Sequence, residues 1–430
     1  MASKQSRRQF LTRAAAFGTG GLLASCATTP PPEEEAALEL AVPHEPTPAP
    51  ILRERRALGP HDNIRCGIIG AGSRGASLLQ TAIGRDDVDV VAVTDSYDVW
   101  RERAVGWCKR EVAEVGEYIH YGEMFENEEL DAVIIATPDH IHADAILAAL
   151  DRSIDVYVEK PMTLTWQEAY RVRNRVYETG AVIQVGTQLR ATDMYMQARD
   201  IIASGRIGDI VSVRVNRDMG NGMVGLYEPP AEANQDNVHW EAFLGDTPYY
   251  TFDPRRYFSW RFFHEYSNGV TGDLMLHHLD VCHFMLGCGM PNRVMSLGDI
   301  YQFDDGRTCP DTISAIIEYP EGFQFMYATT LANNRYGLQE HYLGTKGTIE
   351  FRAMGAMTVY TADTEENFPS GRLNTEALMD DFFSCMRTRE TPIASVEAGF
   401  AGSTICHMAV LSQDTGNAIQ WDHERGLPVV

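Results

Sequence analysis

The glycine-rich segment at residues 70–75 constrains the fold of this chain more than any other feature. It reads Gly-Ala-Gly-Ser-Arg-Gly and directly follows the apolar run Ile64–Ile69, which predicts a buried strand. Helical residues continue to about Gly84, and a second apolar run comes next at residues 88–93. A strand, a glycine-rich turn, a helix and a second strand in this order are typical of a unit that binds a dinucleotide.

Each position of this segment has an expected role at the phosphates. Gly70 permits the tight turn, Gly72 lets a pyrophosphate approach the backbone, and Gly75 permits close packing of the helix on the strand. Ser73 and Arg74 begin the helix, whose N–H groups and positive dipole end attract phosphate. We therefore expect all five residues to form the cofactor site.

An acidic residue, Asp95, ends the second strand of the unit, twenty positions after Gly75. A carboxylate there can accept hydrogen bonds from both ribose hydroxyls and repels a 2′-phosphate. The sequence therefore favours NAD as the cofactor, and Arg74 keeps NADP open as the less favoured alternative.

Strands and helices continue to alternate along the chain. Apolar runs at residues 131–136, 155–158 and 181–185 predict further strands, and residues 143–150 predict a helix between the first two of them. The first of these strands ends in Thr137-Pro138-Asp139-His140-Ile141-His142, and the second ends in Glu159-Lys160-Pro161. In a parallel sheet, such strand ends surround the crevice where ligands bind.

These two segments resemble the T-P-[N/D]-x-x-H and E-K-P segments of the Gfo/Idh/MocA family of NAD(P)-dependent oxidoreductases. The resemblance covers roughly residues 63–420. It implies an α/β fold with an N-terminal Rossmann domain over residues 63–187. A C-terminal α+β domain with an open, mainly antiparallel sheet follows over residues 188–430. It also implies cofactor contacts from Thr137, Pro138, His142, Glu159, Lys160 and Gln188.

The resemblance assigns catalytic roles to three side chains. Lys160 is a cation beside the nicotinamide and the substrate, where it can stabilise a developing alkoxide. Asp273 and His277 lie four positions apart in a predicted helix over residues 268–287, and therefore on one face. The family's Asp-x-x-x-His-x-x-Asp pattern is complete here with Asp280. It implies that His277 transfers the proton and that Asp273 lies beside it at the substrate hydroxyls.

The same helix has a second interpretation as a metal site. Asp273, His277 and either Asp280 or His283 have a spacing that permits two or three ligands on one side. No H-E-x-x-H or cysteine set supports this interpretation, so we expect no metal. The cysteines after residue 26 are scattered through apolar segments and are expected in the core.

The predicted second domain supplies candidate substrate contacts. Arg190 follows a predicted strand end, and an aromatic-rich irregular segment covers residues 219–266. Its Tyr257, Trp260 or Tyr266 could stack on a sugar ring. Alternating runs from residue 292 onward predict an antiparallel sheet, which in the family often mediates oligomers, so a homo-oligomer is expected.

The N-terminal 26 residues have the features of an export signal. Residues 6–13 read Ser-Arg-Arg-Gln-Phe-Leu-Thr-Arg and resemble a twin-arginine signal, and Leu23-Ala24-Ser25-Cys26 resembles a bacterial lipobox. The proline-rich residues 27–62 predict a disordered tether. We therefore expect an exported bacterial protein of the periplasm or cell envelope, with lipidated Cys26 as its only membrane contact and the twin-arginine export machinery as a partner.

The charge of the chain limits its partners. With 36 Lys and Arg against 60 Asp and Glu, the formal net charge is −24, which repels nucleic acid and anionic lipid. A small neutral substrate is easier to reconcile with this charge than a polyanion.

Three functions are compatible with these features. The first is a dehydrogenase that transfers hydride between NAD(P) and a sugar or polyol hydroxyl, with a tightly bound and recycled cofactor because twin-arginine export moves folded proteins. The second is a glycoside hydrolase or lyase that oxidises the sugar transiently, eliminates the aglycone and reduces the product again. The third is a binding lipoprotein without turnover, which the retention of Lys160, Asp273 and His277 argues against.

Overall fold

The predicted βαβ unit lies at the centre of a six-stranded parallel sheet in the computed structural model. The structure describes residues 55–220, 228–352, 356–369 and 374–430. The order of the strands is β3-β2-β1-β4-β5-β6, and every neighbouring pair is parallel. Their bounds are β1 (Ile64–Ile69), β2 (Val88–Thr94), β3 (Gly116–Tyr118), β4 (Ala132–Ile135), β5 (Asp155–Glu159) and β6 (Ile183–Gly186). The chain crosses over beyond β1, so the topological switch point lies between β1 and β4.

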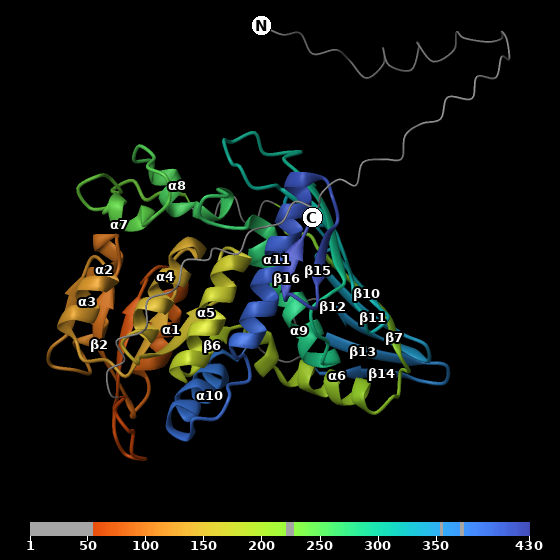
Figure 1. Cartoon of the computed structure of the whole chain (residues 1–430), viewed down its shortest axis with the longest axis horizontal. Coiled ribbons are helices and arrows are strands. Elements are labelled where there is room, and N and C mark those ends of the chain that lie inside the picture. The colour runs from red at the N-terminus through yellow and green to blue at the C-terminus, as the bar shows by residue number, and fades with distance from the viewer. Residues whose placement is uncertain (1–54, 221–227, 353–355, 370–373) are drawn as a thin grey trace, which may run out of the picture. The chain divides into compact units, whose positions relative to one another are not determined.

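Helices pack on both faces of this sheet (Figure 1). They are α1 (Ser73–Ile83), α2 (Asp98–Cys108), α3 (Tyr121–Asn127), α4 (Asp139–Leu150) and α5 (Trp166–Thr179). Because both faces are covered, β4 and β5 are buried at every position and read as nearly continuous apolar runs. The predicted Rossmann fold is confirmed.

A ten-stranded sheet forms most of the second domain. Its order is β14-β13-β12-β11-β7-β10-β9-β8-β15-β16, and among these pairs only β7 and β10 run parallel. The strands are β7 (Ile210–Arg217), β8 (Arg293–Asp299), β9 (Thr312–Glu318), β10 (Gln324–Thr330), β11 (Leu338–Gly344), β12 (Gly347–Arg352), β13 (Ala356–Thr361), β14 (Glu365–Phe368), β15 (Ile419–Asp422) and β16 (Leu427–Val429). The predicted, mainly antiparallel sheet is confirmed.

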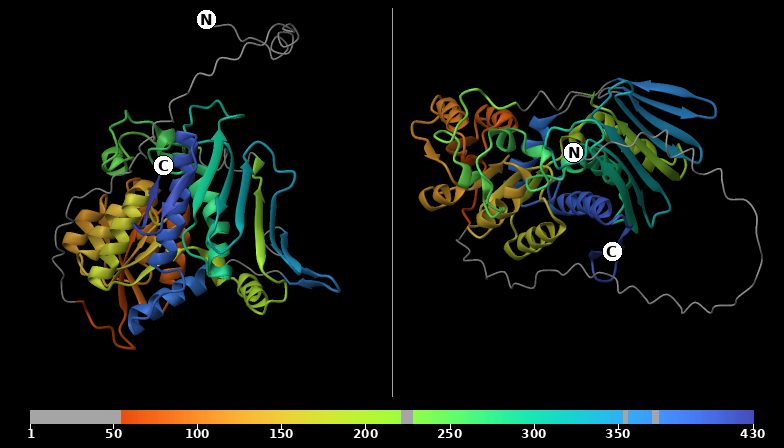
Figure 2. Two further views of the ribbon diagram at one scale, coloured as in Figure 1. Left: turned by 45° about the vertical axis from the view of Figure 1, so that its right-hand side comes forward. Right: turned by 90° about the horizontal axis from the view of Figure 1, so that it is seen from above.

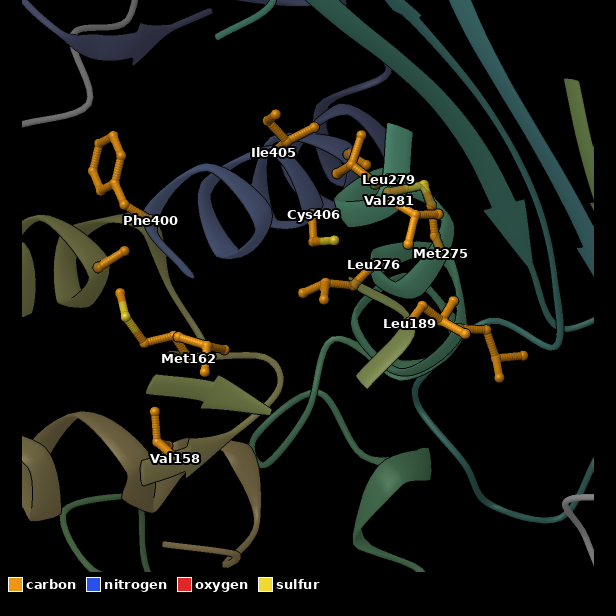
Figure 3. Close-up of a cluster of buried hydrophobic side chains, with 14 of the residues drawn as sticks. Val158, Met162, Leu189, Met275, Leu276, Leu279, Val281, Phe400, Ile405 and Cys406 are labelled. Atoms are coloured by element: carbon orange, nitrogen blue, oxygen red, sulfur yellow. The ribbon is translucent and has the colours of Figure 1, made fainter. Parts of the chain in front are cut away.

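Helices α6 (Asp193–Ala203), α9 (Leu276–Leu286) and α11 (Val396–Thr415) connect the two sheets (Figures 1 and 2). Met162, which follows β5, belongs to the same apolar cluster as Leu276 of α9 and Cys406 of α11 (Figure 3). An added Cβ at Gly399 of α11 would lie 2.6 Å from the Met162 sulfur, so α11 approaches this segment as closely as only glycine permits. This packing fixes the chain after Lys160 against the start of α9.

Helix α10 (Thr375–Thr388) belongs to the second domain by sequence but returns to the first sheet. Its Phe382 packs against Tyr157 of β5, with ring centroids 6.0 Å apart. The apolar cluster of the first domain therefore includes residues from both predicted domains. The predicted domain boundary at residue 187 separates the two sheets, but α10, which lies beyond this boundary in sequence, packs against the first sheet.

Two sequence expectations need correction. The tether predicted over residues 27–62 is too long at its C-terminal end, because Arg55 forms an ion pair with Asp155 and Leu58 packs against the first domain. The helix predicted over residues 268–287 begins instead with a π-helical turn, Thr271–Met275, followed by α9. The irregular segment after residue 219 contains two short helices, α7 (Trp240–Leu244) and α8 (Pro254–Phe258).

The twin arginines and Cys26 lie outside the described residues. Within the described residues, no helix is long and apolar enough to cross a membrane. Six of the seven cysteines after residue 26 are buried and Cys288 is half-buried, as expected of core residues, and all seven are free thiols.

Candidate active site

A cavity of about 710 Å³ lies at the carboxyl ends of the parallel strands, between the first sheet and the second domain. Among the described residues, most of the predicted site residues line it. They are Gly70, Gly72, Ser73, Arg74, Asp95, Thr137, Pro138, Glu159, Lys160, Gln188, Tyr257, Trp260 and His277. The cavity therefore joins the predicted cofactor site to the predicted catalytic residues.

The glycine segment forms the cradle that the fingerprint predicts. Gly70 has a φ of +88°, and a Cβ there would lie 2.7 Å from the Ala136 carbonyl oxygen. A Cβ at Gly75 would lie 1.8 Å from the Gly70 carbonyl oxygen, so only glycine lets α1 begin this close to the turn. No side chain caps the N-terminus of α1 at Gly72, which leaves its N–H groups available to an anion.

Asp95 ends β2 and borders the same end of the cavity. Its carboxylate accepts hydrogen bonds from the backbone N–H groups of Ala71 (2.6 Å) and Tyr97 (2.8 Å). Burial raises the pKa of Asp95, and the two N–H groups oppose that shift. The carboxylate is therefore fixed beside the glycine turn, where a ribose of a bound dinucleotide is expected.

Tyr257 lies at this cofactor end of the cavity and not at the substrate end. Its hydroxyl is 2.9 Å from the Ser96 hydroxyl and 3.4 Å from the Asp95 carboxylate. As a residue of α8, Tyr257 is held by these contacts beside the end of β2, and its expected stacking on a sugar stays a prediction. Tyr266 is fully buried away from the cavity, whereas Trp260 lines it.

Arg74 points away from Asp95, toward the end of β5. Its Nε donates to Glu159 at 2.7 Å, and Gln188 donates to the same Glu159 oxygen at 3.0 Å. Because β5 and β2 lie on opposite sides of β1, Arg74 is not placed to meet a 2′-phosphate near Asp95. Arg74 therefore gives no support to NADP as the cofactor.

The opposite end of the cavity is built around Lys160. Its Nζ donates to the Asp273 carboxylate at 2.7 Å and to the Asp273 carbonyl oxygen at 2.8 Å. Arg261 Nε lies 3.3 Å from the same carboxylate oxygen. Burial alone would raise the pKa of Asp273, but the charges of Lys160 and Arg261 outweigh it and hold that pKa below its usual range.

His277 lines the cavity one turn after Asp273, as the spacing predicts. Burial lowers its pKa well below the usual value, and the charge of Lys160 lowers it further. The imidazole is therefore neutral at pH 7 and able to accept a proton. The pKa of His277 is low because this end of the cavity is both buried and positively charged.

Comparison with known proteins agrees with this geometry. Residues 64–187 match the NAD-binding Rossmann fold of the Gfo/Idh/MocA oxidoreductase family, and residues 243–420 match its C-terminal alpha/beta domain. The chain belongs to this family. It is an NAD-dependent oxidoreductase.

Three similar proteins illustrate the range of the family. The chain is 25% identical over 350 residues to scyllo-inositol 2-dehydrogenase (NAD(+)) of Bacillus subtilis, covering 77% of this chain and 89% of that protein. It is 24% identical over 287 residues to 2,7-anhydro-N-acetylneuraminate hydratase of Mediterraneibacter gnavus, covering 66% of each chain. An oxidoreductase from Agrobacterium radiobacter, solved with NAD+, L-tartaric acid and magnesium, has the same fold. Its TM-score is 0.65 at 13% identity, covering 83% of this chain and 98% of that one.

The residues present fit NAD. Gly70, Gly72 and the free N-terminus of α1 would hold the pyrophosphate, and Asp95 the ribose next to it. Thr137 lines the cavity at the end of β4, and its hydroxyl is a buried polar group without a partner. A bound cofactor would supply the partner that this hydroxyl lacks.

Asp139 is a site residue to which the sequence motifs assigned no role. It is the first residue of α4, is 3% exposed and lines the cavity. Burial raises the pKa of Asp139 to about 7, against the opposing charges of Arg261 and Lys160. Asp139 belongs to the Thr137–His142 segment, so the sequence predicted that it lies at a strand end. Its burial could not be predicted from the sequence.

His142 and Arg190, for which contacts with the cofactor and the substrate were predicted, do not line the cavity either. His142 is 1% exposed, with its ring nitrogens 2.7 Å from the Pro161 carbonyl oxygen and 3.0 Å from that of Thr137. It therefore positions the two strand-end segments and does not contact the cofactor. Arg190 donates from Nε to both oxygens of Asp280, at 2.8 and 2.9 Å, and is structural.

Three polar side chains of the predicted helix over residues 268–287 each bind a different partner. Asp273 binds Lys160 and is not on the cavity wall, Asp280 binds Arg190, and His283 Nε2 lies 2.7 Å from the Tyr319 hydroxyl. In the described part of the chain, no three His, Cys, Asp or Glu side chains come together as a metal site. The expected contact of Asp273 with substrate hydroxyls is corrected to a contact that orients Lys160.

Proposed function

We propose that this enzyme oxidises a secondary hydroxyl of a sugar or polyol to a carbonyl and transfers the hydride to NAD. The observation that carries the proposal is the convergence of Lys160, Asp273 and His277 at one end of the cavity whose other end is the glycine cradle. The similarity to an inositol dehydrogenase supports the same substrate class.

The proposed roles follow from the charge of each group. NAD, when bound, supplies the hydride acceptor. Neutral His277 takes the hydroxyl proton, and the Lys160 ammonium stabilises the negative charge that develops on that oxygen. Asp273 holds the Lys160 side chain in place through the 2.7 Å ion pair.

A substrate panel tests this proposal. The purified enzyme should reduce NAD with at least one member of a panel of inositols, aldoses, uronic acids and anhydrosugars. Lys109→Ala, which removes an exposed lysine, should leave that rate unchanged. If no panel member yields NADH or an oxidised product, although NAD is bound, the proposed dehydrogenase activity is wrong.

A second candidate is a redox-neutral reaction, in which a transiently oxidised sugar loses or gains a group before it is reduced again. Asp139 favours it, because a buried acid with a pKa of about 7 next to Lys160 could move the additional proton that elimination requires. The similarity to a hydratase supports this candidate. Mass spectrometry of glycosides incubated with the enzyme would reveal aglycone release without net NADH.

We further propose that the enzyme is exported folded through the twin-arginine route and held to a membrane by lipid on Cys26, with NAD retained through each cycle. The support is the order of the two signals at the N-terminus. Changing Arg7 and Arg8 to lysine should leave unprocessed protein in the cytoplasm, and Cys26→Ala should abolish labelling with a lipid precursor. Normal export of the double variant would contradict the assignment.

A homo-oligomer is proposed through the outer face of the ten-stranded sheet. Met295, Ile316 and Met326 are cross-strand neighbours on β8, β9 and β10, and each is at least 37% exposed. An apolar row of this kind is typical of a surface that another chain covers. Replacing all three residues with glutamate should reduce the mass measured by light scattering to that of one chain.

A further inference from the structure

Arg217 is a cation on the cavity wall without an acidic partner among the described residues. It is the last residue of β7, where alternation places it on the same face as the buried Val213 and Val215, while Arg214 is exposed. Arg217 lines the cavity, and its Nε is buried with no hydrogen-bond partner. A half-buried guanidinium in this state can donate hydrogen bonds to a bound anion.

His278 provides a second unsatisfied nitrogen on the same wall. Its Nδ1 lies 2.9 Å from Glu340, a fully buried carboxylate that also accepts from the Tyr195 and Tyr342 hydroxyls, each at 2.9 Å. Because Nδ1 is bonded to Glu340, Nε2 is the other polar position of the ring, and it has no partner in the part of the chain that the structure describes. His278 and Tyr195 both line the cavity.

These groups lie around His277. The charge of Arg217 and the ring of His278 both lower the pKa of His277, which places them at the catalytic end. The His278 ring also stacks on Tyr327, with centroids 6.4 Å apart. Arg217 and His278 therefore face the region where a substrate would meet His277, and not the glycine cradle.

The charges at this end leave Arg217 uncompensated. Lys160 and Arg261 share Asp273, whereas Asp139 has a pKa of about 7 and carries only part of a charge at neutral pH. Asp95 and Glu159 belong to the cofactor end, and Glu228 is an exposed side chain with no ion pair to Arg217. The catalytic end is thus positive inside a chain of net charge −24.

We propose that the substrate carries a carboxylate, which Arg217 binds, so that the enzyme acts on a sugar acid and not on a neutral sugar. A guanidinium matches a carboxylate through two parallel hydrogen bonds. His278 Nε2 would form a hydrogen bond with a neighbouring substrate hydroxyl. This inference rests on the proposed function and replaces the neutral substrate that the overall charge had suggested, because the local field opposes the net charge.

Binding of matched sugars to the NAD-loaded enzyme tests this inference without requiring turnover. Isothermal titration would compare D-glucuronate with D-glucose and D-galacturonate with D-galactose. We expect at least one uronate to bind ~10-fold or more tightly than its neutral counterpart. Equal or tighter binding of both neutral sugars would overturn the inference and leave the dehydrogenase assignment standing.

Three variants test whether Arg217 causes the preference for the uronate. Arg217→Gln should weaken uronate binding by ~30-fold or more and abolish the preference, because it removes the charge that pairs with the carboxylate. Arg214→Gln, on the exposed face of the same strand, should retain the preference. Arg217→Lys keeps the charge and should recover part of the affinity. An unchanged preference in Arg217→Gln would overturn the role of Arg217.

Discussion

The two ends of the cavity are built in different ways. The cofactor end is formed by backbone: a left-handed glycine, a helix N-terminus and a carboxylate held by two N–H groups, all within residues 70–97. The catalytic end is formed by side chains from β5, β7, the π-helical turn, α9 and an irregular segment. A motif of consecutive residues therefore specifies the cofactor end. The catalytic end forms only when distant segments come together in the folded chain.

The largest effect on stability and NAD affinity is expected from a change at Gly75, where the backbone itself forms the cofactor end. Gly75→Ala forces a Cβ to within 1.8 Å of the Gly70 carbonyl oxygen, so the turn and α1 must move apart. We expect unfolding free energy to fall by ~1–3 kcal/mol and NAD affinity to fall at least ~100-fold. Thermal unfolding and NAD titration measure both.

Gly106→Ala is the matched control for this change, because a Cβ at this helical glycine meets nothing within 4 Å. It should leave NAD binding unchanged and raise stability by roughly 0.5–1 kcal/mol. Normal NAD affinity in Gly75→Ala would show that the backbone does not form the cofactor end.

A smaller effect is expected from the one side chain that the cofactor end requires. Asp95→Asn removes the negative charge beside the ribose position, so the preference for NAD over NADP should fall by about 10-fold. Asp86→Asn, an exposed change after α1, should leave the preference intact. Tighter binding of NADP than NAD by the unaltered enzyme would remove the role assigned to Asp95.

The smallest effect concerns the buried acid of the catalytic end. Asp139 keeps its proton to about pH 7 in the folded chain, whereas its ordinary pKa is 3.8. Between these values the folded chain binds the additional proton, so Asp139 makes stability fall as pH rises. Asp139→Asn removes this falling contribution, so the slope of the unfolding free energy against pH, measured by urea unfolding, should become more positive across this window. The exposed Asp236→Asn should leave the slope unchanged. An unchanged slope would show that Asp139 ionises normally.

The same contrast explains what the sequence could predict. Gly70, Gly75 and Asp95 were placed correctly because strand, turn, helix and strand are adjacent in the chain, and one motif fixes their geometry. The parallel direction of the strands was expected from the alternation of strands and helices, whereas the order of the strands was not predicted. Lys160 and His277 were found only through family segments, since a lysine at a strand end has no distinctive local pattern.

The remaining site residues depend on packing between distant segments. His278 meets Glu340 across 62 positions, and Arg217 reaches the cavity because β7 lies between β10 and β11. Arg190 was misassigned because nearness to a strand end does not determine direction, and a 3₁₀ turn aims its guanidinium at Asp280. Such contacts cannot be predicted from one segment alone, because they depend on how two distant segments pack in the folded chain.

Hydride transfer in a single turnover tests the central claim most directly. Stopped-flow absorbance of bound NADH would be recorded with the best panel substrate for the unaltered enzyme, Lys160→Ala and His277→Ala. The account predicts that each variant loses at least ~100-fold in rate, as is typical of general acid–base groups, while NAD affinity is unchanged because neither residue belongs to the cradle. An unimpaired rate in Lys160→Ala, or loss of NAD binding in both variants, would contradict it.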